Sequence, residues 1–210
     1  MHEIAVNLLS GNLEWARLQI WELYRRLFES KASVPQQRRA LRYAIILDPE
    51  DHRQNRFLGE CWAKEEGRGS TKALHCFETA CNLRRDFPPY VANLGWTMLA
   101  RGEEGAGAFL SKLQLLEQDC PQAINGHVRL IGSDCLNLCG KEDQAAALRM
   151  EKIGAGSRDA TFYADEAKAR LEAGDATGAL GILVLVEKNG CANDYTTAIQ
   201  ASALRRNDAN

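Results

Sequence analysis

The sequence predicts an all-α protein built as a solenoid, a row of stacked helical hairpins. Apolar residues recur at intervals of three and four, and no stretch alternates at period two for more than a few positions. Helix breakers return at short, even intervals, which suits about a dozen helices. A longer period separates Gly59, Gly95 and Gly132 by 36 and 37 residues, and Gly140 and Gly174 by 34. A two-helix unit of this length cannot bury its apolar face alone, so neighbouring units must stack.

Composition narrows the class of partner. The 210 residues are 45% hydrophobic and 26% charged with a net charge of −2, as in a globular protein. So small a charge gives no general attraction to nucleic acid, and we expect none as a partner. The longest apolar run, residues 178–186, is about half of the roughly 18 residues that a membrane span needs. With no signal-like start either, we expect a cytoplasmic protein without membrane insertion.

The breakers divide the chain into elements in a regular order. Residues 1–17 are predicted to hold an extra helix before the first full hairpin, and residues 194–206 a helix that caps the last one. We expect a single domain over residues 1–210, ending in a polar tail at 207–210. The hairpins between are predicted approximately at residues 18–51, 52–87, 88–124, 125–159 and 160–193.

Local chemistry supports two helix starts. Ser33 and Gln36 have the spacing of a capping box, with Pro35 tolerated in the first helical turn. Asp119 precedes Pro121 in a similar way and predicts a second helix start there.

One stretch has a more specific pattern. The segment Arg56-Phe57-Leu58-Gly59-Glu60-Cys61-Trp62, followed by Ala73, Phe77 and Ala80, resembles the tetratricopeptide repeat (TPR). The resemblance is strongest over residues 45–102 and extends over about four fifths of the chain. It implies a right-handed α-solenoid of about five hairpins, with an extra helix at the start and a capping helix at the end.

The resemblance also implies where helices approach closely. Gly59, Gly95 and Gly132 fall where the two helices of a hairpin cross, and alanines on each second helix have the same role. Gly107 and Ser111 stand where an alanine and an aromatic residue are expected. This departure predicts a shifted second helix in the third repeat.

In this family, the first helix of each hairpin lines a concave groove that holds a peptide of a partner protein. Trp96 is the sharpest candidate there, because Trp is enriched among binding hot spots; packing against a neighbouring hairpin is the alternative. Arginines around an apolar centre suggest a peptide with acidic character. The groove positions are Arg53, Arg56, Glu60, Lys64, Ala92, Asn93, Trp96, Leu99, Arg129 and Ser133.

Asn93 falls on a position that some family members use to hold a carboxyl-terminal carboxylate. The companion positions on the second repeat are Arg56 and Glu60, and those on the fourth are Gly126 and Leu130. That clamp is incomplete, so we do not expect binding of this kind.

The amino-terminal segment is a second candidate surface. Its apolar residues occupy more than one helical face, which a hairpin at the end of a solenoid cannot wholly bury. Either the preceding short helix covers the excess, or a second copy of the chain does. The aromatic residues that would form a homodimer contact are Trp15, Trp21, Tyr24 and Phe28.

Catalytic, cofactor and metal sites are not predicted. The seven cysteines form no C-x-x-C pair, and Cys135 and Cys139, one helical turn apart, are interpreted as small core residues rather than a metal half-site. The Gly-rich stretch at 102–107 lacks the lysine of a phosphate loop and carries acids instead.

Two functions remain open. The first is a non-enzymatic adaptor or scaffold that grips a segment of another protein. The alternative is a dedicated chaperone, because residues 47–53 and 58–61 resemble the translocator chaperones of bacterial type III secretion. A helical repeat that binds RNA is disfavoured, since the groove has no continuous basic stripe.

Overall fold

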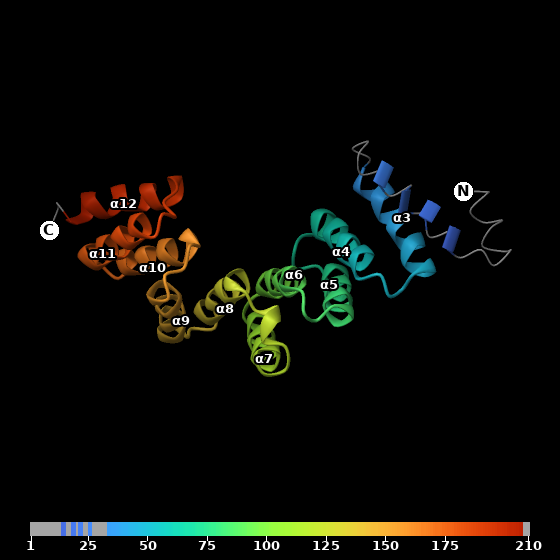
Figure 1. The fold of residues 1–210 in the computed structure, drawn as a ribbon, viewed down its shortest axis with the longest axis horizontal. Coiled ribbons are helices and arrows are strands. Elements are labelled where there is room, and N and C mark those ends of the chain that lie inside the picture. The colour runs from blue at the N-terminus through green and yellow to red at the C-terminus, as the bar shows by residue number, and fades with distance from the viewer. Residues whose placement is uncertain (1–13, 16–17, 20, 23–24, 27–32, 208–210) are drawn as a thin grey trace. The chain divides into compact units, whose positions relative to one another are not determined.

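The computed structural model describes residues 14–15, 18–19, 21–22, 25–26 and 33–207. These residues form helices joined by short turns, with no strand among them, and the predicted all-α class is confirmed (Figure 1). None of the described helices is long and apolar enough to cross a membrane. The helices are α3 (Val34–Leu47), α4 (His52–Glu66), α5 (Thr71–Leu83), α6 (Pro88–Leu99), α7 (Glu103–Asp119), the 3-10 turn η1 (Pro121–Ala123), α8 (Gly126–Leu138), α9 (Glu142–Gly154), α10 (Ala160–Glu172), α11 (Ala176–Lys188) and α12 (Asp194–Asn207).

The chain divides into two compact units, residues 1–124 and residues 125–210. In the first unit, each helix from α3 to α7 packs against the next one along the chain. In the second, α8 to α12 do the same, and α12 also packs against α10. Packing of each element on its sequence neighbours is what a stack of hairpins requires. The prediction of one domain over the whole chain stays a prediction.

Polar side chains cap the starts of three helices. The backbone N–H of Ser33 donates to Gln36 Oε1 at 3.0 Å, and Pro35 lies in the first turn of α3, as predicted. Asp51 and Asn125 accept hydrogen bonds from backbone N–H groups in the first turns of α4 and α8, at 2.8 and 2.9 Å. Each bond satisfies a donor that the helix itself leaves unpaired.

The helix start predicted at Asp119 is wrong. Asp119 is the last residue of α7, and residues 121–123 form a single 3-10 turn. The next helix begins only at Gly126, because the Asn125 side chain provides its cap.

Small residues set the spacing of the helices, as predicted. A Cβ atom on Gly59 in α4 would lie 2.8 Å from Cε1 of Phe77 in α5, which is closer than two non-bonded carbon atoms approach each other. Gly95 and Gly132 are also buried. The alanines that the repeat pattern places on second helices are 0% exposed: Ala73, Ala80, Ala145 and Ala179.

The shift predicted for the third hairpin is present in α7. Ala106 and Phe109, rather than Gly107 and Ser111, are 0% exposed and supply the small and aromatic core positions. A Cβ atom on Gly105 would overlap a backbone carbonyl oxygen of α6. The close approach of α6 and α7 therefore depends on Gly105.

A buried ion pair ties three helices of the second unit together. Arg149 of α9 is 3% exposed; its Nε donates to Glu166 Oε2 of α10 at 3.0 Å, and its Nη1 donates to Ser133 Oγ of α8 at 3.0 Å. Arg170 donates to the other oxygen of Glu166 at 3.0 Å. Since every charge in this set is paired, its burial does not leave an uncompensated ion.

Two half-buried carboxyl groups lie near this ion pair. The pKa of Asp134 is raised to about 6, chiefly by burial and also by the Asp165 charge, while Arg149 opposes the change. Burial also raises the pKa of Asp165. Asp134 therefore carries its negative charge in a place that disfavours it.

Candidate functional site

Four of the predicted groove residues line one cavity in the first unit. Glu60 and Lys64 come from α4, and Asn93 and Trp96 come from α6. The cavity has a volume of about 270 Å³. We name it the Trp96 cavity; its lining is Glu60, Ala63, Lys64, Arg68, Phe77, Asn93, Trp96 and Thr97.

Trp96 is half-buried at this cavity, and a cation lies over its ring. The guanidinium carbon of Arg68 is 5.9 Å from the ring centroid, within the range of a cation–π contact. Thr97, the next residue, is 1% exposed, and its hydroxyl donates to the Asn93 carbonyl at 2.9 Å. The Trp96 ring is thus partly exposed at the cavity, whereas the Thr97 hydroxyl is already hydrogen-bonded to the Asn93 carbonyl.

The negative charge of Glu60 is paired with Arg56 on the same helix. Arg56 donates to Glu60 Oε1 through Nη2 at 2.6 Å and through Nε at 2.9 Å, an i,i+4 pair. The Arg56 guanidinium also lies 4.8 Å from the centroid of the Phe57 ring. Arg56 therefore reaches the cavity through Glu60 rather than by lining it.

Arg68 belongs to the turn between α4 and α5, and this turn is fastened to the one between α6 and α7. Gly67 has a φ of 91°, which glycine adopts without strain. The Gly69 carbonyl accepts a hydrogen bond from Arg101 Nη1 at 3.0 Å. A Cβ atom on Gly69 would lie 3.0 Å from the Ala100 carbonyl oxygen, so the absence of a side chain permits this approach.

Sequence reasoning misses Arg68 as a site residue. From the sequence, the segment Gly67-Arg68-Gly69 indicates only a helix break, and the repeat pattern assigns groove positions to helices alone. A signal is nevertheless present: this turn is two residues longer than the repeat pattern requires, and a basic residue stands between its glycines.

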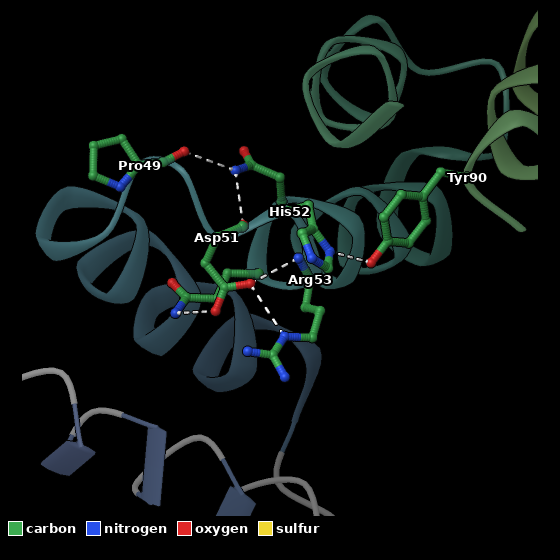
Figure 2. A network of polar contacts seen from close by, with 7 residues as sticks. Pro49, Asp51, His52, Arg53 and Tyr90 are labelled. Atoms are coloured by element: carbon green, nitrogen blue, oxygen red, sulfur yellow. Dashed lines mark hydrogen bonds and ion pairs between the residues drawn. The ribbon is translucent and has the colours of Figure 1, made fainter. Parts of the chain in front are cut away.

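Arg53 lies in a separate network at the start of α4, shown in Figure 2. Its Nε is 3.4 Å from Asp51 Oδ1, and its guanidinium is 5.6 Å from the centroid of the Trp21 ring. His52 Nδ1 lies 2.5 Å from the Tyr90 hydroxyl, which links α4 to α6. This network does not line the Trp96 cavity.

The remaining predicted groove residues are placed differently. Leu99 is half-buried on α6, and Ala92 is only 5% exposed. Arg129 and Ser133 lie on α8, in the second compact unit. Arg129 is half-buried, whereas Ser133 is 1% exposed and its hydroxyl accepts from Arg149. Ser133 is thus a structural residue that no peptide at the surface can reach.

The predicted homodimer surface is described only in part. Trp21 is half-buried and packs against the core formed by α3, α4 and α5. Trp15 is also half-buried. Tyr24 and Phe28 lie outside the described residues.

The cysteines in the described part of the chain are free thiols. Cys135 is 0% exposed, and burial raises the pKa of its thiol to about 12. Such a thiol stays protonated at neutral pH, which fits its interpretation as a small core residue. The described residues contain no group of three or more His, Cys, Asp or Glu side chains that could hold a metal ion.

Comparison with known proteins finds likeness in structure alone, since no family model and no curated protein matches the sequence. PilW, a type IV pilus biogenesis factor, has a TM-score of 0.66 at 16% identity, over 92% of this chain and 88% of PilW. TTC0263, a thermophilic TPR protein of Thermus thermophilus, has a TM-score of 0.62 at 17% identity, over 90% of this chain and 98% of its own. A MamA RS-1 double mutant has a TM-score of 0.64 at 11% identity, over 85% of this chain and 96% of the MamA chain.

At these identities the likeness shows the fold. The chain is an all-α helical-repeat protein whose helices pack in sequence order within each of its two units. More narrowly, its repeats are TPR-like, as the residues around Gly59 predict.

Proposed function

We propose that this chain is a non-enzymatic interaction module that binds a peptide segment of a partner protein at the face formed by α4 and α6. The observation that carries the proposal is the Trp96 cavity. It gathers Glu60, Lys64, Asn93 and Trp96, which come from the first helices of two successive hairpins. The repeat pattern assigns all four to the groove.

The size and contents of the cavity suit a peptide side chain. Its volume of about 270 Å³ lies just below the roughly 300–1,000 Å³ of pockets that enclose drug-sized ligands. Its lining has no Ser, Cys or His, and the Thr97 hydroxyl is engaged with a backbone carbonyl. A nucleophile paired with a base is therefore missing from the cavity, which supports binding rather than catalysis there.

A phage-displayed library of random peptides tests this proposal without a known partner. Peptides selected on the wild-type protein would be synthesised with a fluorescent label, and their affinity measured by fluorescence anisotropy. We expect Trp96→Ala to weaken binding by ~1–3 kcal/mol, as for a hot-spot residue. Arg56→Ala should weaken it also, because Glu60 then presents an unpaired negative charge to the cavity.

The matched control is Tyr195→Ala, which removes an aromatic ring that is 51% exposed on α12. Circular dichroism would verify that each variant is folded. Equal affinity of the wild-type protein and the Trp96→Ala variant for all selected peptides would contradict the proposal.

The sequence also suggests two more specific functions, chaperone activity and self-association, and each can be tested directly. A dedicated chaperone would keep one aggregation-prone client soluble on co-expression, and Trp96→Ala would abolish that protection. Self-association would appear as a dimer mass in light scattering that Trp15→Ala reduces. Trp21 is less suited to this second test, because it packs against the core of its own chain.

A further inference from the structure

We infer that the Trp96 cavity selects a side-chain carboxylate, that of an Asp or Glu within the bound peptide. Arg68 is the residue that binds this carboxylate. This inference rests on the proposed function and names the chemistry of the partner.

The balance of charge at the cavity is positive. Glu60 is held by Arg56, and within the described part of the chain neither Lys64 nor Arg68 has an ion-pair partner. The two acids next in sequence are also engaged, Glu65 with Arg38 and Glu66 with Lys72. Two cations thus face the cavity without a compensating anion, and a carboxylate is the peptide group that complements them.

The contact of Arg68 with Trp96 leaves its hydrogen-bond donors available. A guanidinium group has five N–H donors, and a cation–π contact with 5.9 Å between its central carbon and the ring centroid is not a hydrogen bond that would occupy them. A carboxylate can accept two of these bonds side by side while the apolar part of its side chain lies on the indole. Lys64, in the last turn of α4, supplies a second positive charge to the same cavity.

The turn that carries Arg68 is already ordered before a peptide arrives. Arg101 donates to the Gly69 carbonyl, and the same nitrogen lies 3.4 Å from the Thr71 hydroxyl. Gly69 itself approaches the Ala100 carbonyl. Because this backbone is held in place, binding requires less ordering of the loop than a free turn would need.

The carboxylate is assigned to a side chain rather than to a peptide terminus. Of the positions that would complete a clamp for a terminal carboxylate, Arg56 is engaged with Glu60, and Gly126 and Leu130 offer no cation. Peptides displayed in the interior of a phage coat protein have no free terminus at the binding site. They therefore test the side-chain assignment directly.

Charge reversal is the decisive experiment. We expect peptides selected on the wild-type protein to share one Asp or Glu next to an apolar residue. Replacing that acid by Gln should lower affinity about tenfold, and amidation of the peptide terminus should leave affinity unchanged. The variant Arg68→Glu should invert the preference and bind the Lys-substituted peptide more tightly than the acidic one. Arg85→Glu, the same change at an exposed arginine outside the cavity, should keep the wild-type order.

Failure of this inference differs from failure of the proposed function. Selected peptides that depend on Trp96 but show no acidic preference would overturn the inference and leave the binding face in place. An acidic preference that survives in Arg68→Glu would do so too. Selected peptides whose affinity is unchanged in Trp96→Ala would instead overturn the proposed function.

Discussion

Asp134 provides a quantitative prediction about stability. Its pKa is raised from 3.8 to about 6 in the folded chain, chiefly because burial disfavours the charged carboxylate. Between those two values the folded state binds more protons than the unfolded state does. The free energy of unfolding therefore falls as the pH rises through this window, and Asp134 destabilises the fold at neutral pH.

The magnitude follows from the two pKa values. A difference of about two pKa units corresponds to about 3 kcal/mol at most. The Asp134 side chain is only half-buried, and solvent screening reduces that figure. We expect Asp134→Asn, which is isosteric and uncharged, to raise the free energy of unfolding by about 1–2 kcal/mol at pH 7.5. At pH 4 the gain should almost vanish, because the wild-type carboxyl is then protonated.

Urea unfolding provides the assay and an internal reference. All four tryptophans lie between residues 15 and 96, so tryptophan fluorescence reports on the first unit alone. Circular dichroism follows helices of both units. The Asp134→Asn change should move the circular dichroism transition and leave the fluorescence transition in place. Glu187→Gln, at an exposed acid on α11, is the control for adding an amide. An equal gain at pH 4 and pH 7.5 would refute the argument from ionisation.

Four further variants test individual contacts. Gly105→Ala should destabilise the chain by about 1–3 kcal/mol in urea unfolding, because its Cβ would overlap a carbonyl of α6. Gly107→Ala in the same helix meets nothing within 4 Å and should stabilise it by about 0.5–1 kcal/mol; the opposite order would contradict the geometry. Arg101→Ala should lower peptide affinity several-fold in anisotropy while the helical circular dichroism spectrum is retained, since it releases the turn that carries Arg68. Ser133→Ala should cost about 1 kcal/mol of stability, with unchanged peptide affinity as the sign of a structural role.

The fold is predictable because its signals are local. The Ser33 and Gln36 pair lies within one helical turn, and the repeat of 34 to 37 residues depends on small residues within single hairpins. Gly140 and Gly174 adopt positive φ values of 69° and 84° in the turns that their spacing predicts. The misplaced start at Asp119 shows the limit of such signals. Proline there begins a single 3-10 turn, and a cap four residues later begins the helix.

The assignment of Ser133 shows what a repeat pattern leaves out. Its position along α8 is a groove position, but its burial is decided by Arg149, which comes from the following helix. The guanidinium needs a partner in the core, and Glu166 of a third helix completes the set. No feature around Arg149 in the sequence distinguishes it from a surface arginine. A buried ion pair among three helices becomes visible only when the helices are placed.

Arg68 is the opposite case: the repeat pattern does not assign it to the groove, yet it lines the Trp96 cavity. The pattern groups Lys64 with Trp96, and both line one cavity because they lie on first helices whose spacing the hairpin period fixes. Arg68 reaches the same cavity from a turn whose backbone is held by the hydrogen bond from Arg101 to the Gly69 carbonyl. Specificity in a helical repeat can therefore depend on turn residues as well as on groove-facing helices. Under the proposed function, the helices supply Trp96 and the charge of Lys64, and the turn adds a second positive charge through Arg68.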